Sequence, residues 1–168
     1  PSQPTMLGIA RRPESEDGKT MEPLENHGLQ VMSIGFLVDP DDAMIWRGPM
    51  ATQALEQLLR QTNWQELDYL LVDMPPGTGD IQLTLSQRVP MTGAVIVTTP
   101  QDIALLDAKK GIKMFQKVGV PILGIVENMA VHVCSQCGHA EHIFGADGGK
   151  KMAAEYGMDY LGALPLDM

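Results

Sequence analysis

Runs of consecutive apolar residues constrain the fold of this chain more than any other feature. Four of them have strand length: LDYLLVDM (67–74), GAVIVTTP (93–100), PILGIVENM (121–129) and MDYLGALPL (158–166). Apolar residues follow one another in these runs instead of alternating with polar ones, which is typical of strands covered on both faces. Segments with helical periodicity separate them. This alternation predicts an α/β sandwich of three layers around a mainly parallel sheet.

The helical segments are expected at 48–62, 80–89, 102–119 and 148–157. In the third, Leu105, Ala108, Ile112 and Phe115 form an apolar stripe, and Gly119 provides a stop signal. A further apolar run at 30–38 predicts another strand, and the polar residues 11–28 predict a loop or short hairpin. The 168 residues suffice for one domain, in which residues 130–147 form a loop that holds both cysteines.

Charge and composition narrow the possible partners. The net charge is −9, so the surface repels phosphate backbones and anionic lipids, and we expect neither nucleic acid nor a membrane as a partner. No apolar run approaches the roughly 20 residues that span a bilayer. Two cysteines are too few for a disulfide scaffold and indicate a reducing compartment, for which the cytoplasm is our expectation.

A phosphate-binding corner is predicted where the first of the four runs ends, in DMPPGTGD (73–80). The carboxylate of Asp73 at the end of a buried strand can hold Mg²⁺, directly or through water. Gly77 and Gly79 leave backbone N–H groups open to a phosphate. The structural alternative is a tight turn capped by Asp73. The complete string favours the functional interpretation.

Other polar or turn-forming residues follow the remaining strands. Thr99, Asn128 and Pro165 fall at or just after predicted strand ends, as Asp73 does. The carboxyl ends of parallel strands share one edge of a sheet, so these residues should gather there. A nucleotide site also needs a phosphate loop of the form G-x-x-x-x-G-K followed by serine or threonine. Neither Gly18-Lys19-Thr20 nor Gly149-Lys150-Lys151 has the required context, so we expect that loop upstream of residue 1.

Several motifs together resemble those of the Mrp/ApbC family. They are DMPPGTGD, IWRGPM (45–50), TTPQDIALLDAKKGI (98–112), VENM (126–129) and CSQCGH (134–139). Members of this family are P-loop ATPases of the MinD/ParA-like group that carry iron–sulfur clusters. The resemblance implies a P-loop NTPase fold that lacks its first strands and its phosphate loop in this chain.

The resemblance also implies roles for particular residues. Asp73 would be the acid that holds Mg²⁺, and Gly77 would belong to the switch that faces the γ-phosphate of ATP. Asn128 would hydrogen-bond adenine, for which a capped strand end is the plain structural alternative. Pro165 would lie in the same nucleotide site. Arg47 would reach phosphate or a partner subunit, with a surface salt bridge as an equal alternative.

The C-x-x-C pair, Cys134 and Cys137, allows three interpretations. Two chains could each supply both thiolates to one 4Fe–4S cluster, as the resemblance implies and as four-cysteine ligation requires. Alternatively, Zn²⁺ could take both cysteines and two of the nearby histidines of one chain. The third interpretation is a thiol–disulfide switch, but such pairs usually start a helix, and here the next helix is expected near residue 148.

The expected function is therefore an ATP-dependent carrier. A homodimer would bind one 4Fe–4S cluster and pass it to apo-proteins, with slow ATP hydrolysis in the full-length protein. Residues 1–168 alone should be inactive without the phosphate loop. A MinD/ParA-like positioning ATPase and a zinc-stabilised module without activity are the alternatives.

Overall fold

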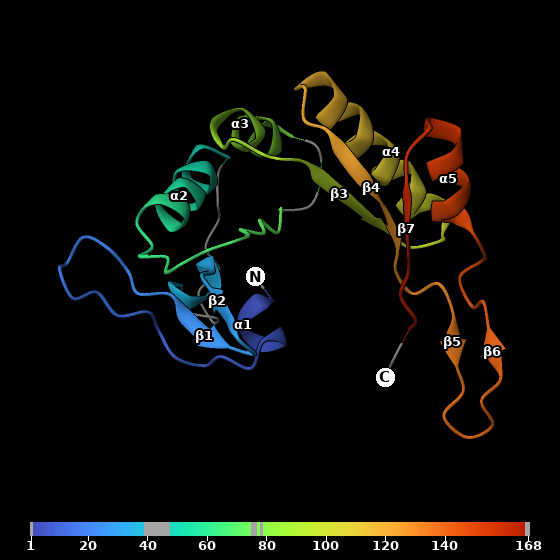
Figure 1. Cartoon of the computed structure of the whole chain (residues 1–168), viewed down its shortest axis with the longest axis horizontal. Coiled ribbons are helices and arrows are strands. Elements are labelled where there is room, and N and C mark those ends of the chain that lie inside the picture. The colour runs from blue at the N-terminus through green and yellow to red at the C-terminus, as the bar shows by residue number, and fades with distance from the viewer. Residues whose placement is uncertain (1, 39–47, 75–76, 78, 167–168) are drawn as a thin grey trace. The chain divides into compact units, whose positions relative to one another are not determined.

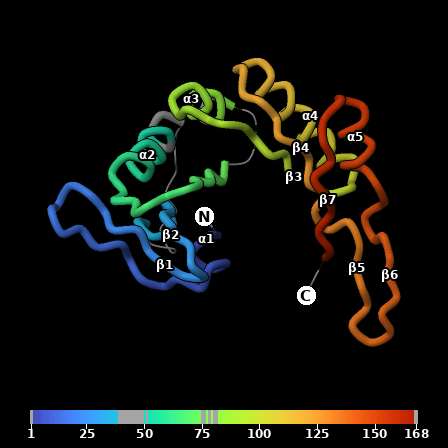
Figure 2. Tube along the Cα trace, viewed as in Figure 1, coloured from blue at the N-terminus to red at the C-terminus, as the bar shows by residue number. Residues whose placement is uncertain are grey.

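The computed structural model describes residues 2–38, 48–74, 77 and 79–166. The chain divides into two compact units, Pro1–Met74 and Pro75–Met168, and each is described by itself. Figure 1 labels the elements, and Figure 2 follows the Cα trace from one terminus to the other. None of the described helices is both long enough and apolar enough to cross a membrane.

The first unit contains short elements around a small core. In chain order they are α1 (Gln3–Met6), β1 (Leu24–Asn26), β2 (Leu29–Val31), the 3-10 helix η1 (Ile34–Phe36) and α2 (Gly48–Arg60). β1 and β2 pair antiparallel. β1 lies within residues 11–28, for which a loop or short hairpin is predicted, but β2 lies just beyond them, so that prediction is only partly right. The helix predicted at 48–62 is confirmed as α2. The strand predicted at 30–38 is only partly right, because the chain turns into η1 after Val31.

The strand predicted at 67–74 is wrong. The structure forms no strand there, and the side chains of Tyr69 and Leu71 are 86% and 91% exposed. Apolar residues make a segment suitable for a sheet, but a strand exists only when a neighbouring strand takes up its N–H and C=O groups. No described strand pairs with residues 67–74. The sequence signal therefore reports a tendency that this chain does not realise in the structure.

The second unit is an α/β structure with a parallel sheet, which confirms the predicted fold class. Its elements are α3 (Asp80–Arg88), β3 (Ala94–Thr98), α4 (Asp102–Lys117), β4 (Ile122–Glu127), β5 (His132–Val133), β6 (Ala140–Glu141), α5 (Gly148–Tyr156) and β7 (Tyr160–Ala163). The sheet has the order β3-β4-β7, and both pairings are parallel. α4 and α5 pack along it (Figure 1). Gly119, with a φ of 74°, follows the end of α4 as predicted.

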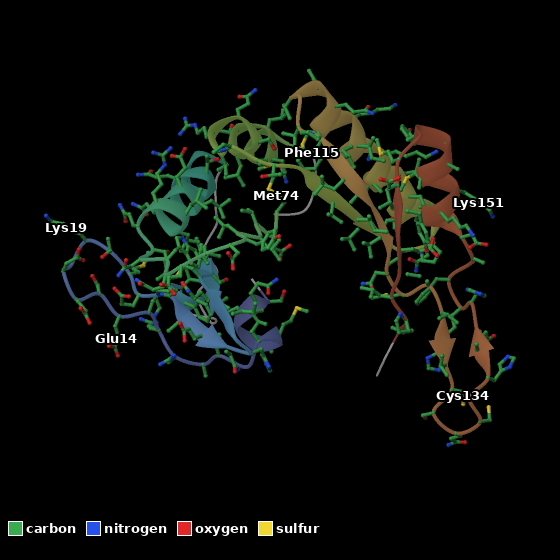
Figure 3. All side chains as sticks on the ribbon, in the orientation of Figure 1. Glu14, Lys19, Met74, Phe115, Cys134 and Lys151 are labelled. Atoms are coloured by element: carbon green, nitrogen blue, oxygen red, sulfur yellow. The ribbon has the colours of Figure 1, made fainter. Side chains whose placement is uncertain are left out.

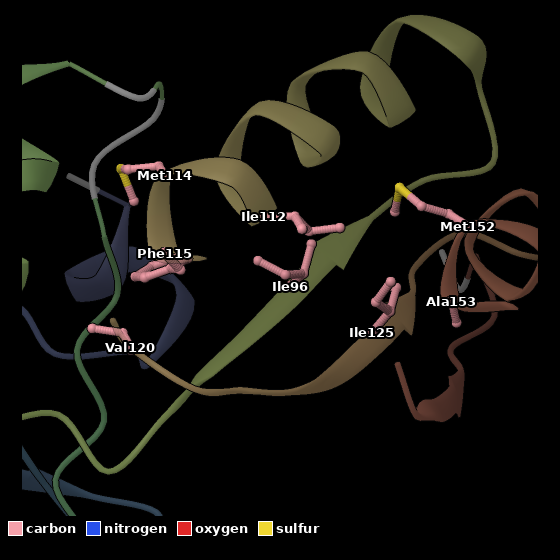
Figure 4. Close-up of a cluster of buried hydrophobic side chains, with 8 residues drawn as sticks. All are labelled: Ile96, Ile112, Met114, Phe115, Val120, Ile125, Met152 and Ala153. Carbon is pink, nitrogen blue, oxygen red and sulfur yellow. The ribbon is translucent and has the colours of Figure 1, made fainter. Parts of the chain in front are cut away.

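The main core lies between this sheet and its helices (Figure 4). Ile112 on α4 and Ile125 on β4 are fully buried, and Ile96, Phe115 and Met152 complete the contact. The stripe predicted on α4 is confirmed, because Leu105 and Ala108 pack against the same cluster. Burial of these side chains, worth about 1.5–3 kcal/mol each, is what holds the two helices to the sheet.

The sheet is covered unequally on its two faces. On β3, Ile96 and Thr98 are buried, whereas Val95 and Val97 are 46% and 60% exposed. The residues of α4 and α5 that reach the sheet join the cluster around Ile96 and Ile125, on the face opposite Val95 and Val97. The apolar strands predict that both faces of the sheet are covered. Within the described part of the second unit, the face of β3 that carries Val95 and Val97 is not covered.

Truncating a buried side chain on α4 tests this account of the core. We expect Ile112→Ala to lower the free energy of unfolding by about 2–5 kcal/mol, because the fully buried side chain leaves a cavity. Ile103→Ala on the same helix is the matched control, since Ile103 is 78% exposed. Its effect should stay within about 0.5 kcal/mol. Urea denaturation measures both; equal losses would contradict the assignment of the core.

Candidate functional site: the cysteine hairpin and the strand ends

The two cysteines lie at the tip of a hairpin that sequence analysis expected as a plain loop. β5 and β6 pair antiparallel, with His132 opposite Glu141 and Val133 opposite Ala140. Figure 2 shows this hairpin extending beyond the end of β4, and Figure 3 places Cys134 at its tip. The pair therefore occupies a turn between strands and not the first turn of a helix, where redox C-x-x-C pairs usually lie.

Backbone hydrogen bonds set the shape of this turn. The N–H of Cys134 donates to the carbonyl of His139 at 2.9 Å, and the N–H of Gly138 donates to the carbonyl of Cys134 at 2.8 Å. Gly138 has a φ of 72°, a conformation that costs glycine little and other residues more. The chain thus folds back immediately after Cys137, which turns both thiols onto the same tight loop.

The turn stabilises a thiolate at Cys134. The backbone N–H groups of Gln136 and Cys137 point at its sulfur and hold the pKa of the Cys134 thiol below its ordinary value; the thiol of Cys137 adds to this. Partial burial acts in the opposite direction but does not outweigh them. Because the thiolate is the form that binds metal, this arrangement favours a metal ligand. Cys137 is exposed, so the tip is open to a partner.

His132 and His142 lie nearer the base of the hairpin than its tip, whereas His139 lies in the turn beside Cys134. Nδ1 of His142 donates to the carbonyl of Ala130 at 2.7 Å, so that nitrogen is already used. Nδ1 of His132 is buried without a hydrogen-bond partner among the described residues. The described part of the chain contains no group of three or more His, Cys, Asp and Glu side chains that could hold a metal ion.

A cavity of about 520 Å³ in the second unit lies along β3 and α4 and reaches Asn128, the residue after β4. Its polar lining comes from Thr98, Thr99, Asp107 and Asn128, and its apolar lining from β3 and α4. The N–H of Asn128 donates to the carbonyl of Thr98 at 2.7 Å, and its Oδ1 accepts the N–H of Met129 at 3.0 Å. The side-chain amide nitrogen of Asn128 is then the group that could donate to a ligand.

Pro165 lies beside the same strand end. The N–H of Leu164 donates to the carbonyl of Glu127 at 2.8 Å, and the N–H of Leu166 donates to the carbonyl of Val131 at 2.8 Å. Pro165 therefore sits in a stretch that runs along the residues before and after Asn128. The structure thus brings Thr99, Asn128 and Pro165 to neighbouring positions at one edge of the sheet. Their roles toward a nucleotide stay predictions.

Asp73 belongs to the first unit, and its carboxylate has a partner that sequence reasoning missed. Oδ2 of Asp73 accepts a hydrogen bond from Nε2 of Gln3 at 2.7 Å, across 70 residues of sequence. Gln3 is the first residue of α1. No local pattern signals a contact over this separation. Among the residues that the structure describes, Gln3 is the partner recorded for this carboxylate.

The glycines after Asp73 lie at the start of α3. Gly79 is its N-cap, and Gly77 has a φ of 97°, which favours glycine. The first N–H groups of a helix lack intrahelical partners and can bind an anion. Arg47 lies outside the described residues. Asp73 and Gly77 fall in different units, so their predicted joint site is kept as a prediction.

With the fold and the hairpin established, comparison with known proteins defines the class. The family described as ParA, the NUBPL iron-transfer P-loop NTPases, matches residues 1–168. A nucleotide-binding protein of Archaeoglobus fulgidus, solved in complex with ADP and with cobalt, shares the fold with a TM-score of 0.81. It is 35% identical, and the match covers 99% of this chain and 65% of that one.

Curated relatives agree with this class. The iron-sulfur cluster carrier protein of Escherichia coli K12 is 64% identical over 99% of this chain and 45% of its own length. The iron-sulfur cluster carrier protein of Pseudomonas fragi is 62% identical, and the match covers 100% of this chain and 59% of that protein. The iron-sulfur cluster transfer protein NUBPL of Mus musculus is 54% identical, and the match covers 100% of this chain and 53% of that protein. The chain belongs to this family of P-loop iron–sulfur cluster carriers, and it spans about half the length of the curated relatives it matches.

The lowered pKa of Cys134 predicts how its thiol reacts. In a Cys137→Ser variant, the pH midpoint of alkylation by iodoacetamide should lie lower in the folded protein than in the same protein unfolded in urea. The backbone N–H groups that stabilise the thiolate are held in place only by the folded turn. Mass spectrometry of quenched samples gives both midpoints. Equal midpoints would show that the turn does not stabilise the thiolate.

Proposed function

We propose that this chain is part of an ATP-dependent iron–sulfur carrier in which two copies hold one 4Fe–4S cluster between their cysteine hairpins. The observation that carries the proposal is the exposed two-cysteine turn with a stabilised thiolate at Cys134. One chain supplies two thiolates, and a 4Fe–4S cluster takes four cysteine ligands, so two chains are needed. The cluster is cargo here, bound at a tip that an acceptor protein can also reach.

The position of the cysteines supports transfer. A cluster buried in a core would have to wait for local unfolding before it could leave, whereas thiolates on a turn can exchange with those of an incoming acceptor. The partners in this proposal are a second copy of the chain and apo-proteins with free cysteine ligands. Iron–sulfur chemistry also requires thiols kept reduced, which agrees with the cytoplasm as the expected compartment.

The nucleotide would bind at the strand ends. A cavity of about 520 Å³ has the size of small-molecule sites, and the amide of Asn128 at its rim can pair with a base edge. Pro165 would lie next to the nucleobase, in the same site as Asn128. Asp73 would hold Mg²⁺ through its carboxylate, one oxygen of which accepts a hydrogen bond from Gln3. The N–H groups around Gly77 would face the γ-phosphate, and Arg47 would contact phosphate or the partner copy.

Hydrolysis would need more than these residues. Stabilisation of the transferring phosphoryl group requires a lysine-bearing phosphate loop, and residues 1–168 contain no such sequence. We therefore assign ATP hydrolysis to a full-length protein and expect the chain alone to be inactive. In the full-length protein, the nucleotide state would control how readily the cluster is released.

The identity of the bound metal tests the proposed carrier function. After anaerobic reconstitution, wild-type protein should hold iron and acid-labile sulfide in equal amounts, and the Cys134→Ser, Cys137→Ser double variant should lose at least nine-tenths of both. His139→Ala and His142→Ala are the matched controls, which should keep their iron because thiolates alone ligate the cluster. Zinc bound in preference to iron, and lost in the histidine variants, would favour the zinc module instead.

The role of Asp73 is tested in full-length protein. Asp73→Asn should lower the ATP hydrolysis rate about 100-fold. The reason is that a bound metal ion stabilises the charge of the transition state by several kcal/mol. Asp68→Asn, which changes an exposed carboxylate in the same segment, is the control and should have little effect. Cluster binding should persist in both variants. An Asp73→Asn protein that hydrolyses ATP normally would remove Asp73 from the site.

A further inference from the structure

Glu127 is a buried carboxylate that the proposed function does not use. It is the last residue of β4 and only 2% exposed, directly before Asn128. Its Oε2 accepts a hydrogen bond from the N–H of Gly149 in the first turn of α5. A buried carboxylate is costly unless it is paired. The start of a helix offers both an N–H donor and a partial positive charge, so this contact compensates the burial.

Two glycines allow α5 to come this close. A Cβ atom on Gly149 would lie 3.1 Å from Oε2 of Glu127, and one on Gly148 would lie 2.8 Å from the carbonyl oxygen of Pro100. Both contacts are tighter than ordinary van der Waals distances. The glycines are therefore needed for close approach of the helix to the end of β4 and to the loop after β3.

The contact closes the base of the cysteine segment. Residues 128–147, which carry the hairpin, start immediately after Glu127 and end just before Gly148. Backbone hydrogen bonds hold the start of this segment. The N–H of Asn128 donates to the carbonyl of Thr98 at 2.7 Å, and the N–H of Ala130 donates to the carbonyl of Leu164 at 3.0 Å. The hydrogen bond from the N–H of Gly149 to the carboxylate of Glu127 holds the end of the segment, where α5 begins, against the same strand end.

We propose that Glu127 is a positioning residue, which fixes the cysteine hairpin relative to the sheet and so sets how firmly the iron–sulfur cargo is held. The consequence for the cargo rests on the proposed function, whereas the placement of the hairpin does not. A cluster shared by two chains needs four thiolates at defined positions. Supporting contacts that restrict the ligand-bearing segment then affect retention, as they do around other metal sites.

Distances between spin labels test the placement. One label is attached to Cys137 and the other to a Lys113→Cys residue on the exposed side of α4, in a Cys134→Ser background.

Glu127→Gln keeps an acceptor oxygen but loses the charge, and Glu127→Leu loses both. The width of the distance distribution should increase at least twofold in Glu127→Leu and less in Glu127→Gln. Glu155→Gln, which changes an exposed carboxylate on α5 paired with Lys109, should leave the width unchanged.

Cluster release to a chelator, measured with both cysteines intact, separates positioning from local stability. Release should be at least threefold faster in Glu127→Leu than in Glu155→Gln. Unchanged widths would overturn the proposal, because Glu127 would then only cap α5. Broader distributions with unchanged release would overturn the claim that Glu127 sets how firmly the cargo is held. If Glu127→Leu does not fold, Glu127→Gln and Gly149→Ala carry the same test. Wild-type protein that takes up no iron would refute the proposed function, while the widths would still decide the role of Glu127 in placing the hairpin.

Discussion

The parallel pairing of β3 with β4 is the interaction on which the rest of the second unit depends. It aligns Thr98 with Glu127, so the two strands end together and the segments that follow them leave from one edge. Asn128 is then tied to Thr98, the cavity forms beside both, and the cysteine hairpin starts a few residues later. Because the core around Ile112 and Ile125 fixes the strands, it also fixes where this edge lies.

The hairpin itself needs little of this framework. Its turn is held by bonds within residues 134–139, and the N–H groups that stabilise the Cys134 thiolate come from the next residues along the chain. The stabilisation of the Cys134 thiolate is therefore local, whereas the place of the hairpin depends on the strand ends from which it starts. This division suits a carrier, because thiolates can be ready to bind a cluster while the segment that bears them is oriented by contacts elsewhere.

Local patterns predicted much of this structure, and distant contacts explain the rest. The stripe on α4 and the strands β3 and β4 follow from residues close in sequence, and so does the position of the C-x-x-C pair outside any helix. Metal binding by that pair stays a prediction. Residues 67–74 have the composition of a strand, but strand formation depends on a partner that composition cannot supply. The bond between Gln3 and Asp73 joins residues 70 positions apart. Glu127 stands in an apolar strand, and its burial becomes understandable only when Gly149 is seen beside it.

The measurement that tests the central claim most directly is native mass spectrometry of the anaerobically loaded protein. A cluster shared between two C-x-x-C hairpins predicts one species with two chains, four irons and four sulfides, which separates into single chains when the cluster is removed. Cluster or zinc on single chains, with no metal-dependent two-chain species, would contradict the account. The cysteine turn would then serve one chain alone.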